Sequence, residues 1–292
     1  MENTIKHYYN FKEVKIIYDS TNKKYIKSGD KTYELFEVID RESVIEAYNI
    51  TQKYEDYQKI IVNKYNSIFT PYKEKVFILI EQKQIEKEIR KINISNYEFK
   101  KLKIDDWKYI WQRKIDYFEF QMLHIKGKYK IIDESFDYFV GLAENAISYL
   151  WINQLDNTNE NTLCRRRINK DNNYNYNPLN IVIDCPMRDV GEYLKMIFWT
   201  KNYDETKLRK IIKTIIMQNE NVKILFARLL YPSYYFDIYE KIIQEEQKEI
   251  ELINIINRID EYEEYLSKIY EMIKEDYKDI NPIEWIKKSE SL

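Results

Sequence analysis

The chain has 292 residues, with 47 Lys and Arg against 49 Asp and Glu, so its formal net charge is -2. Aromatic residues make up 15% of the chain and supply enough apolar area for a folded core, which argues against global disorder. The balanced charge argues against a nucleic-acid partner bound through phosphate neutralisation, and the length fits two domains or one bilobal domain.

Residue counts argue against further classes of protein and of binding site. No apolar run approaches the roughly 20 residues that a membrane helix needs, so no membrane partner is expected. The amino terminus lacks the apolar region of a signal peptide, which predicts synthesis in a cytoplasm. The 4 Gly cannot form a Walker A or GxGxxG loop. Because the only Cys are Cys164 and Cys185, and the only His are His7 and His124, a disulfide framework is excluded and a zinc site is not expected.

The first part of the chain alternates short β-like segments with turns. Strands are predicted at Val14–Tyr18, Lys24–Lys27 and Tyr33–Ile39, with a hairpin turn at Ser28-Gly29-Asp30. Helical spacing covers residues 41–60, and two further strands are expected at Ile60–Ile68 and Lys75–Glu81. This order describes a small α+β lobe over residues 1–82.

A charged linker is predicted over 83–103, and a mainly helical lobe over 104–292. Asp105 or Asp106 is expected to cap a helix that carries Trp107, and a second helix is expected after Ser135. Further helices are predicted at residues 189–199, 205–218 and 222–230. Between them lies a polar stretch, 153–177, which ends in a short apolar strand, Asn180–Asp184.

Residues 245–274 are predicted to form one long carboxy-terminal helix. Apolar residues recur there at alternating steps of three and four: Leu252, Ile255, Ile259, Tyr262, Leu266, Ile269 and Ile273. This stripe fits a coiled-coil homodimer. Ile253 and Ile256 widen the apolar face, which favours packing onto the protein's own helices.

Three segments resemble one known family. The stretch 136–147 (FDYFVGLAENAI), the stretch 184–194 (DCPMRDVGEYL) and the stretch 227–235 (ARLLYPSYY) look like the CotS/YutH group of endospore-coat-associated proteins, and most like its YutH type. That family resembles aminoglycoside phosphotransferases and choline kinases. The resemblance implies an α+β, bilobal, protein-kinase-like fold with a small antiparallel-sheet N-lobe and a mainly helical C-lobe.

The resemblance also states which residues a phosphotransferase would need. The phosphate-binding lysine should lie on the strand Tyr33–Ile39, which carries Glu34 and Glu37 instead; Lys24, Lys27 and Lys31 are the neighbouring alternatives. The catalytic loop of the related kinases is replaced by Cys164-Arg165-Arg166-Arg167. An arginine cannot accept the proton of the acceptor hydroxyl, because it stays protonated.

The other candidate site residues fit either a functional or a structural role. Asp184 falls where the family's metal-binding aspartate is expected, and Asn172 stands about where a metal-binding asparagine is expected. Asp184 serves equally as a brace for the loop before Arg188 and Asp189, which are expected to form a structural contact. Arg165, Arg166 and Arg167 form either a solvated or ion-paired turn or an anion-binding remnant of the cleft.

The resulting hypothesis is a spore-coat-associated pseudokinase that acts as a binding and assembly protein. Its partners would be other spore coat proteins, and it would be made without a signal peptide in the mother-cell cytoplasm. The alternative is an active ATP-dependent phosphotransferase for a small molecule or a protein. In that case Asp171 would orient the hydroxyl, and Asp184 with Asn172 would hold Mg2+ and ATP.

Overall fold

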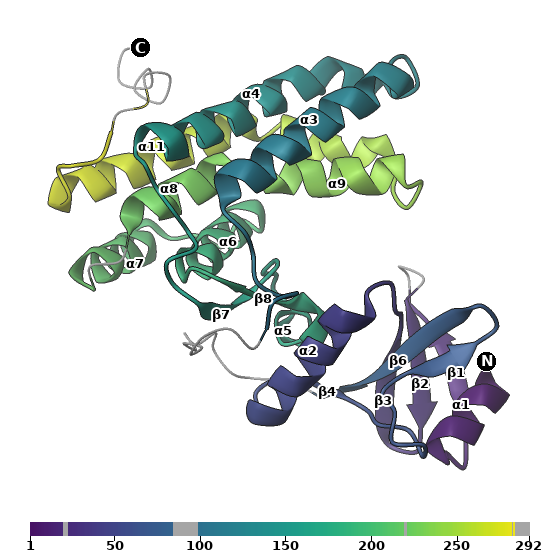
Figure 1. Cartoon of the computed structure of the whole chain (residues 1–292). Helices are drawn as coiled ribbons and strands as arrows, with labels where there is room; N and C mark the ends of the chain where they lie inside the picture. Colours follow the sequence, from purple (N-terminus) through teal and green to yellow (C-terminus); the bar gives the residue numbers. More distant parts are fainter. Residues whose placement is uncertain (20–22, 84–98, 219–220, 282, 284–292) are drawn as a thin grey trace. The chain divides into compact units, whose positions relative to one another are not determined.

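The computed structural model describes the whole chain except residues 20–22, 84–98, 219–220, 282 and 284–292 (Figure 1). The chain forms two compact units. Unit 1 comprises Met1–Lys103 and Asn161–Ile183, and unit 2 comprises Ile104–Glu160 and Asp184–Leu292. Each unit has hydrophobic clusters of its own, and each is described below by itself.

Unit 1 is built on an antiparallel sheet. Its strands are β1 (Lys15–Tyr18), β2 (Lys24–Ser28), β3 (Lys31–Glu37), β4 (Lys59–Ile60), β5 (Thr70–Tyr72) and β6 (Lys75–Gln82). They follow the order β1-β2-β3-β6-β4, and β5 pairs with β6. The predicted meander is confirmed, and Gly29 has the positive φ of 60° that its turn requires.

Two helices pack on this sheet. α1 (Glu2–Tyr9) shares a cluster with Phe77 and Leu79, whereas α2 (Arg41–Lys53) contributes to a cluster with Ile78 and Ile80. Because side chains alternate along a strand, β6 buries both of its faces. That explains why residues 76–80 read as an unbroken apolar run.

Several predictions for this region were wrong. The helix expected over 41–60 ends at Lys53, and the strand expected over 60–68 pairs only at Lys59–Ile60. The ammonium of Lys59 donates to the backbone oxygens of Thr51 and Tyr54, which satisfies carbonyls at the end of α2. After Ile60 the chain turns around Asn63, whose side chain accepts from the backbone of Tyr65 and Ser67. Neither α1 nor β5 was predicted.

The segment Asn161–Ile183 belongs to unit 1, although the predicted division placed it in the helical lobe. It contains β7 (Thr162–Arg165), α5 (Asn172–Asn175), the turn η1 (Pro178–Asn180) and most of β8 (Ile181–Asp184), and β7 pairs with β8. The backbone N–H groups of Gln58 and Ile183 donate to the oxygens of Tyr176 and Leu102, at 3.1 and 2.8 Å. A separate cluster joins Leu163 and Ile181 of this segment to Ala47 of α2. Much of the predicted linker, 83–103, lies outside the described residues.

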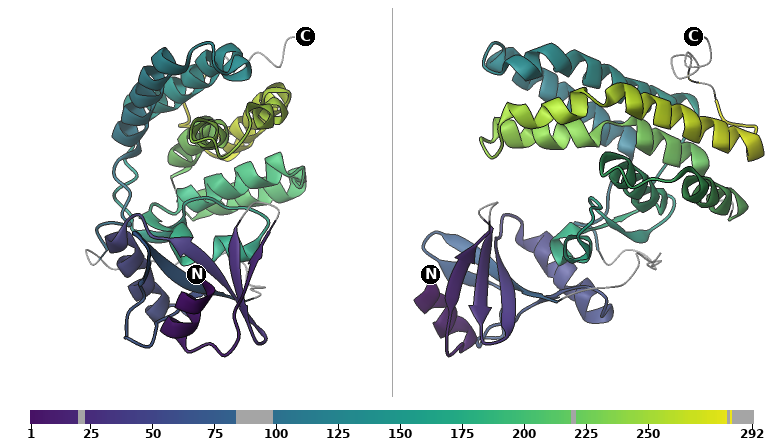
Figure 2. Two further views of the ribbon diagram at one scale, coloured as in Figure 1. Left: turned by 90° about the vertical axis from the view of Figure 1, so that its right-hand side faces the viewer. Right: turned by 180° about the vertical axis from the view of Figure 1, so that it is seen from behind.

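Unit 2 is helical. Its longer helices are α3 (Trp107–Ile125), α4 (Lys130–Ile152), α6 (Met187–Trp199), α7 (Glu205–Met217), α8 (Val222–Leu230), α9 (Ser233–Ile243) and α11 (Ile259–Asp276). α8 is the central helix, since it packs against α4, α6 and α11 and nearly all its residues are buried. α3 and α4 run side by side on one flank of the unit (Figures 1 and 2). No helix among the described residues is long and apolar enough to cross a membrane.

The carboxy-terminal region differs from the single long helix that was predicted. The chain forms a turn, η2 (Glu249–Leu252), a short helix, α10 (Ile253–Ile256), and then α11. The break allows the Arg258 guanidinium to donate to the backbone oxygens of Phe198 and Trp199 at 3.3 and 3.1 Å. Leu252, Leu266 and Ile269 of the predicted stripe are buried in the core of unit 2, so these side chains do not present a coiled-coil seam. Two further boundaries were wrong: α4 begins at Lys130 rather than after Ser135, and α9 was not predicted.

Candidate functional site

The three consecutive arginines occupy three different environments in unit 1. Arg165 is fully buried, with its guanidinium 5.7 and 5.1 Å from the ring centres of Tyr57 and Tyr176. Arg166 is exposed, and Arg167 is half-buried with its guanidinium donating to the Arg166 oxygen at 2.8 Å. Stacking on aromatic faces stabilises the buried guanidinium. The side chain of Arg165 therefore belongs to the core of unit 1.

The amide-rich loop that follows is held by its own side chains. The Asn175 side chain accepts from the Asn169 N–H at 2.9 Å and donates to the Asn169 oxygen at 2.8 Å. The Asn180 side chain donates to the Arg167 oxygen at 2.8 Å. Asp171 caps α5 by accepting from the Asn173 N–H at 2.9 Å, and Asn172 is the first residue of that helix. The asparagines that made this stretch look irregular thus replace regular backbone pairing.

The strand where a phosphate-binding lysine was sought carries a buried carboxylate. Glu34 of β3 is 5% exposed and lies 3.6 Å from the Lys23 ammonium. The Gln82 side chain donates to the same carboxylate at 3.4 Å. Burial raises the pKa of Glu34, and Lys23 opposes that shift. Lys31 belongs to β3 itself and forms an ion pair at 2.7 Å with Glu81.

Asp184 is the centre of a buried polar network in unit 2. Its side chain is fully buried, and each of its oxygens accepts at least two hydrogen bonds. Oδ2 accepts from Trp107 Nε1 and Arg188 Nη1, both at 2.8 Å. Oδ1 accepts from Asn157 Nδ2 at 2.9 Å and from the Cys185 N–H at 2.8 Å. This arrangement matches the bracing role for Asp184, and Arg188 forms a buried ion pair with it at 2.8 Å.

The network continues along one face of α6. Residues 184, 188, 192 and 195 follow steps of four, four and three, so they fall on one side of a helix. Glu192 accepts from Arg228 Nε and Nη2 of α8 at 3.0 and 2.7 Å. Lys195 donates to the backbone oxygen of Tyr231 at 2.8 Å and to the Ser233 hydroxyl at 3.1 Å. These bonds join α6 to α8 and to the start of α9.

Aromatic rings complete the contact between α3 and α8. The Arg228 guanidinium lies 5.0 Å from the ring centre of Trp107, and Trp107 stacks on Trp111 at 5.2 Å. Trp111 in turn stacks on Tyr231 at 4.3 Å. The close approach of Arg228 requires a glycine on α6, because a Cβ at Gly191 would lie 2.7 Å from Arg228 Cγ. Two of the three segments that carried the family resemblance are therefore parts of one structural contact.

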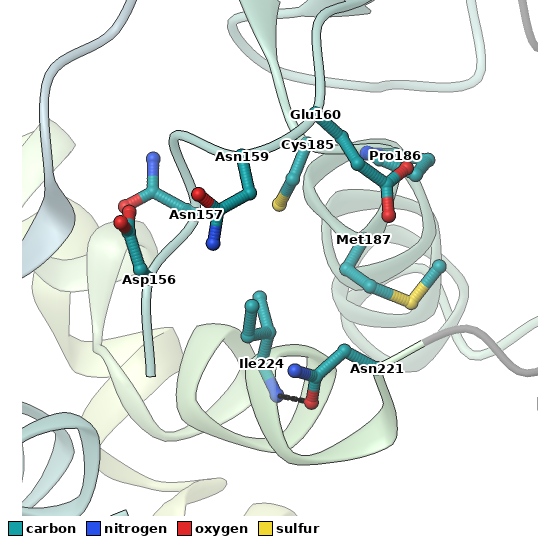
Figure 3. A pocket seen from close by; sticks show the side chains of 9 residues that line it. All are labelled: Asp156, Asn157, Asn159, Glu160, Cys185, Pro186, Met187, Asn221 and Ile224. Carbon is teal, nitrogen blue, oxygen red and sulfur yellow. Dashed lines mark hydrogen bonds between the residues drawn. The ribbon is translucent and has the colours of Figure 1, made fainter. Parts of the chain in front are cut away.

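A small pocket of about 130 Å³ lies beside this network (Figure 3). Its lining consists of Asp156, Asn157, Asn159, Glu160, Cys185, Pro186, Met187, Asn221 and Ile224. The Cys185 sulfur points into it (Figure 3). Burial, followed by the charge of Asp184, raises the pKa of the Cys185 thiol well above its ordinary value, so the thiol stays protonated at neutral pH and is a poor nucleophile. Among the described residues, no group of three or more His, Cys, Asp or Glu is arranged to hold a metal ion.

Residues 2–269 match the family described as "Spore coat putative kinase YutH". The chain belongs to this family. The endospore coat-associated protein YutH of Bacillus subtilis (strain 168) is 27% identical to it over 169 residues, which is 50% of this chain and 49% of that protein. The match thus spans about half the length of that relative.

Solved structures place the YutH-family chain in a kinase-like fold. An aminoglycoside phosphotransferase from Alicyclobacillus acidocaldarius matches with a TM-score of 0.55 and 10% identity, covering 94% of this chain and 97% of that one. A spectinomycin phosphotransferase in complex with ADP and spectinomycin matches with a TM-score of 0.50 and 10% identity, covering 99% and 96%. The antiparallel sheet followed by a mainly helical remainder is the architecture that the sequence resemblance implied.

The predicted site residues divide between the two units. Arg165, Arg166, Arg167 and Asn172 belong to unit 1, whereas Asp184, Arg188 and Asp189 belong to unit 2. Within unit 2, the structure brings Asp184 and Arg188 together, and Asp189 lies in the first turn of α6, where a negative charge is favourable.

Sequence reasoning missed most partners in the network. They are Trp107, Asn157, Glu192, Lys195 and Arg228. The helical spacing of charged residues from 184 to 195 was the available signal. That spacing alone does not predict burial, because polar residues at helical spacing usually form a solvated face.

Proposed function

We propose that this YutH-family chain is a pseudokinase that contributes to the spore coat by binding other coat proteins rather than by transferring phosphate. The name of the Bacillus subtilis relative supports the coat setting, and the fold supports descent from a phosphotransferase. The observation that carries the proposal is the environment of Asp184, because this residue stands where the resemblance places the metal-binding carboxylate.

The donors around Asp184 do not fit a magnesium site. Mg2+ demands oxygen ligands in near-ideal octahedral geometry, whereas both oxygens of Asp184 already accept from protein donors, one of which is the Arg188 guanidinium. A cation at this carboxylate would have to displace those donors and face the positive charge of Arg188. Arg165 likewise has a structural environment, since it is buried with its guanidinium against the rings of Tyr57 and Tyr176.

Two other parts of a phosphotransferase are altered. Glu34 occupies the strand on which a phosphate-binding lysine was expected, and its charge would repel a triphosphate. The stretch Cys164-Arg165-Arg166-Arg167, which the resemblance matches to the catalytic loop, offers no carboxylate, and an arginine cannot accept a proton. The proposed pseudokinase therefore has neither ATP nor Mg2+ as a cofactor.

The competing function is an active phosphotransferase that uses Asp171, with Asn172 and Asp184 on the metal. Asp171 lies in unit 1, near enough to Glu34 and Tyr25 for its charge to raise the pKa of both groups. The proximity of Asp171 to the sheet is the observation that favours this alternative. In the pseudokinase, Asp171 serves only as the cap of α5.

Phosphate transfer separates the two functions. The full chain would be incubated with Mg2+ and ATP labelled at the γ-phosphate, together with solubilised coat proteins or small alcohols. We expect no transfer and no shift of the unfolding temperature at millimolar nucleotide. Transfer that is lost in Asp171→Asn would establish the alternative, because asparagine caps a helix as well as aspartate and leaves the fold intact.

The binding role has its own readout. A fluorescent fusion of the full chain, followed during sporulation, is expected to reach the coat. Asp171→Asn and Arg167→Ala are expected to localise like the unmodified fusion, because binding needs no phosphate chemistry. Loss of coat localisation in both variants, with unchanged unfolding temperatures, would contradict the proposal.

A further inference from the structure

An exposed apolar stripe follows the outer side of α3 and continues onto the end of α4. Its members are Tyr109, Tyr117, Phe120 and Leu123 of α3 and Trp151 and Ile152 of α4, which are 46% to 77% exposed. The ring centres of Tyr109 and Trp151 lie 5.5 Å apart, which connects the two helices. We call this stripe the α3–α4 face. From Tyr109 to Leu123 it is about 20 Å long at the helical rise per residue.

Four carboxylates lie along the same helix pair, Asp116 and Glu119 on α3 with Asp137 and Glu144 on α4. All four are exposed, and within the described part of the chain none of them forms an ion pair with a lysine or arginine. They are close enough to act on one another. Burial raises the pKa of Glu119, and the charges of Glu144, Asp116 and Asp137 raise it further.

The lysines and arginine of α3 have contacts within unit 2, and those of Lys108 and Arg113 are with residues of the α3–α4 face itself. Lys114 pairs with Glu240 at 2.9 Å, and the Arg113 Nε donates to the Tyr109 oxygen at 3.4 Å. Lys108 pairs with Asp106 at 3.2 Å, and its ammonium lies 4.9 Å from the ring centre of Trp151. The four carboxylates thus repel one another and lie beside an exposed apolar stripe.

We propose that the α3–α4 face binds a basic amphipathic helix of a partner protein. Large apolar side chains exposed together mark interaction surfaces, and aromatic residues are enriched at the centres of such surfaces. The negative charge beside them selects lysine or arginine and disfavours acidic partners or nucleic acid. A helix with apolar residues on one side and lysines flanking them satisfies both halves of the surface, in the manner of an amphipathic helix laid on a groove.

This inference rests on the proposed binding role and specifies the chemistry of one partner. Its failure is distinguishable from failure of that role, because it depends on residues far in the sequence from Asp171 and Asp184. Phosphate transfer by the chain would overturn the proposed function while leaving the α3–α4 face to be judged by binding alone.

The test uses a synthetic 18-residue helix of leucine, alanine and lysine, with leucines on one side and lysines flanking them. Its dissociation constant for the full chain would be measured by fluorescence anisotropy at two salt concentrations. Asp116→Asn/Glu119→Gln is expected to weaken binding at least tenfold and to reduce the salt dependence. Phe120→Ser/Leu123→Ser is also expected to weaken binding at least tenfold, but with the salt dependence unchanged.

Two controls keep the proposal falsifiable. Glu246→Gln/Glu264→Gln removes the same number of exposed carboxylates elsewhere in unit 2 and is expected to bind like the unmodified chain. A scrambled peptide of identical composition, with leucines and lysines mixed around the helix, is expected to bind at least tenfold more weakly. Equal binding of the two peptides, equal effects of the two carboxylate pairs, or unchanged binding by both α3 variants would overturn the proposal.

Discussion

Unit 2 contains two groups of charged side chains, one buried and paired with opposite charges, the other exposed and without such pairs among the described residues. In the interior, Asp184 pairs with Arg188 and Glu192 pairs with Arg228, at 2.8 and 2.7 Å. On the outer side of α3 and α4, Asp116, Glu119 and their neighbours repel one another. A charge buried without a partner would cost several kcal/mol, so the interior must compensate its charges. Exposed charges are screened by water, so an uncompensated surface group is tolerated and is free to serve a partner.

The strongest test of this contrast breaks the interior pair. Arg228→Met leaves the Glu192 carboxylate without the guanidinium that donates to it at 3.0 and 2.7 Å. We expect the free energy of unfolding to fall by about 3–5 kcal/mol, measured by urea denaturation. The double variant Glu192→Leu/Arg228→Met should lose less than the single one, because it leaves no buried charge unpaired. A double variant that is less stable than Arg228→Met would refute the compensation.

A second test changes the charge of Asp184 but keeps its shape. Asp184→Asn replaces one carboxylate oxygen with an amide NH2. That NH2 would face either Trp107 Nε1 and Arg188 Nη1 or the two donors to the other oxygen, so a donor would meet donors. We expect a loss of about 3 kcal/mol in the free energy of unfolding. Asp189→Asn is the matched control at the half-buried first turn of α6, where the expected loss is below about 1 kcal/mol. Equal losses at the two positions would remove the special role of Asp184.

A third test concerns the space between α6 and α8. Gly191→Ala would place a Cβ 2.7 Å from Arg228 Cγ, and that side chain is fixed by its bonds to Glu192. We expect a destabilisation of about 1–3 kcal/mol despite the better helix propensity of alanine. Gly141→Ala on α4 is the control, since its Cβ would meet nothing within 4 Å, and it should stabilise the chain by up to about 1 kcal/mol. Thermal unfolding of both variants checks the opposite signs.

The smallest effect is expected on the α3–α4 face. The pKa of Glu119 is raised in the folded chain, so this group favours folding below the ordinary carboxyl pKa of about 4.3, and that contribution is lost as the pH rises through its folded value. Glu119→Gln should therefore raise stability at pH 7 by a few tenths of a kcal/mol and less at pH 4. Unfolding midpoints at the two pH values measure the difference. A variant that is less stable at pH 7 would show that Glu119 has a favourable partner.

Local patterns predicted most elements correctly and failed where tertiary contacts overrode them. The limits of α8 were predicted to the residue, and in the structure Asn221 caps its start and Pro232 follows its end. The carboxy-terminal helix was predicted as continuous because its apolar spacing is unbroken. Only the fold reveals that Arg258 interrupts it to reach carbonyl groups of α6.

Predictions for the candidate site were limited in the same way, by contacts with distant segments. The sequence and its family resemblance singled out Asp184, Arg188 and the three arginines, but not what each side chain touches. Arg165 and Arg166 are adjacent in one run of three arginines, yet Arg165 is buried beside Tyr57 and Tyr176 and Arg166 is exposed. The partners come from segments far along the chain, so no local pattern could separate the two.

The sequence by itself determined the alternation of elements, the kinase-like architecture and the family, because apolar periodicity, caps and motifs are local properties of a chain. Tertiary structure alone decided that residues 161–183 join the first unit, that the stripe near the carboxy terminus is core, and that Asp184 is enclosed by donors. The physical reason is that burial and hydrogen bonding of a charged side chain depend on groups brought from distant segments. Those groups are adjacent only after the chain has folded.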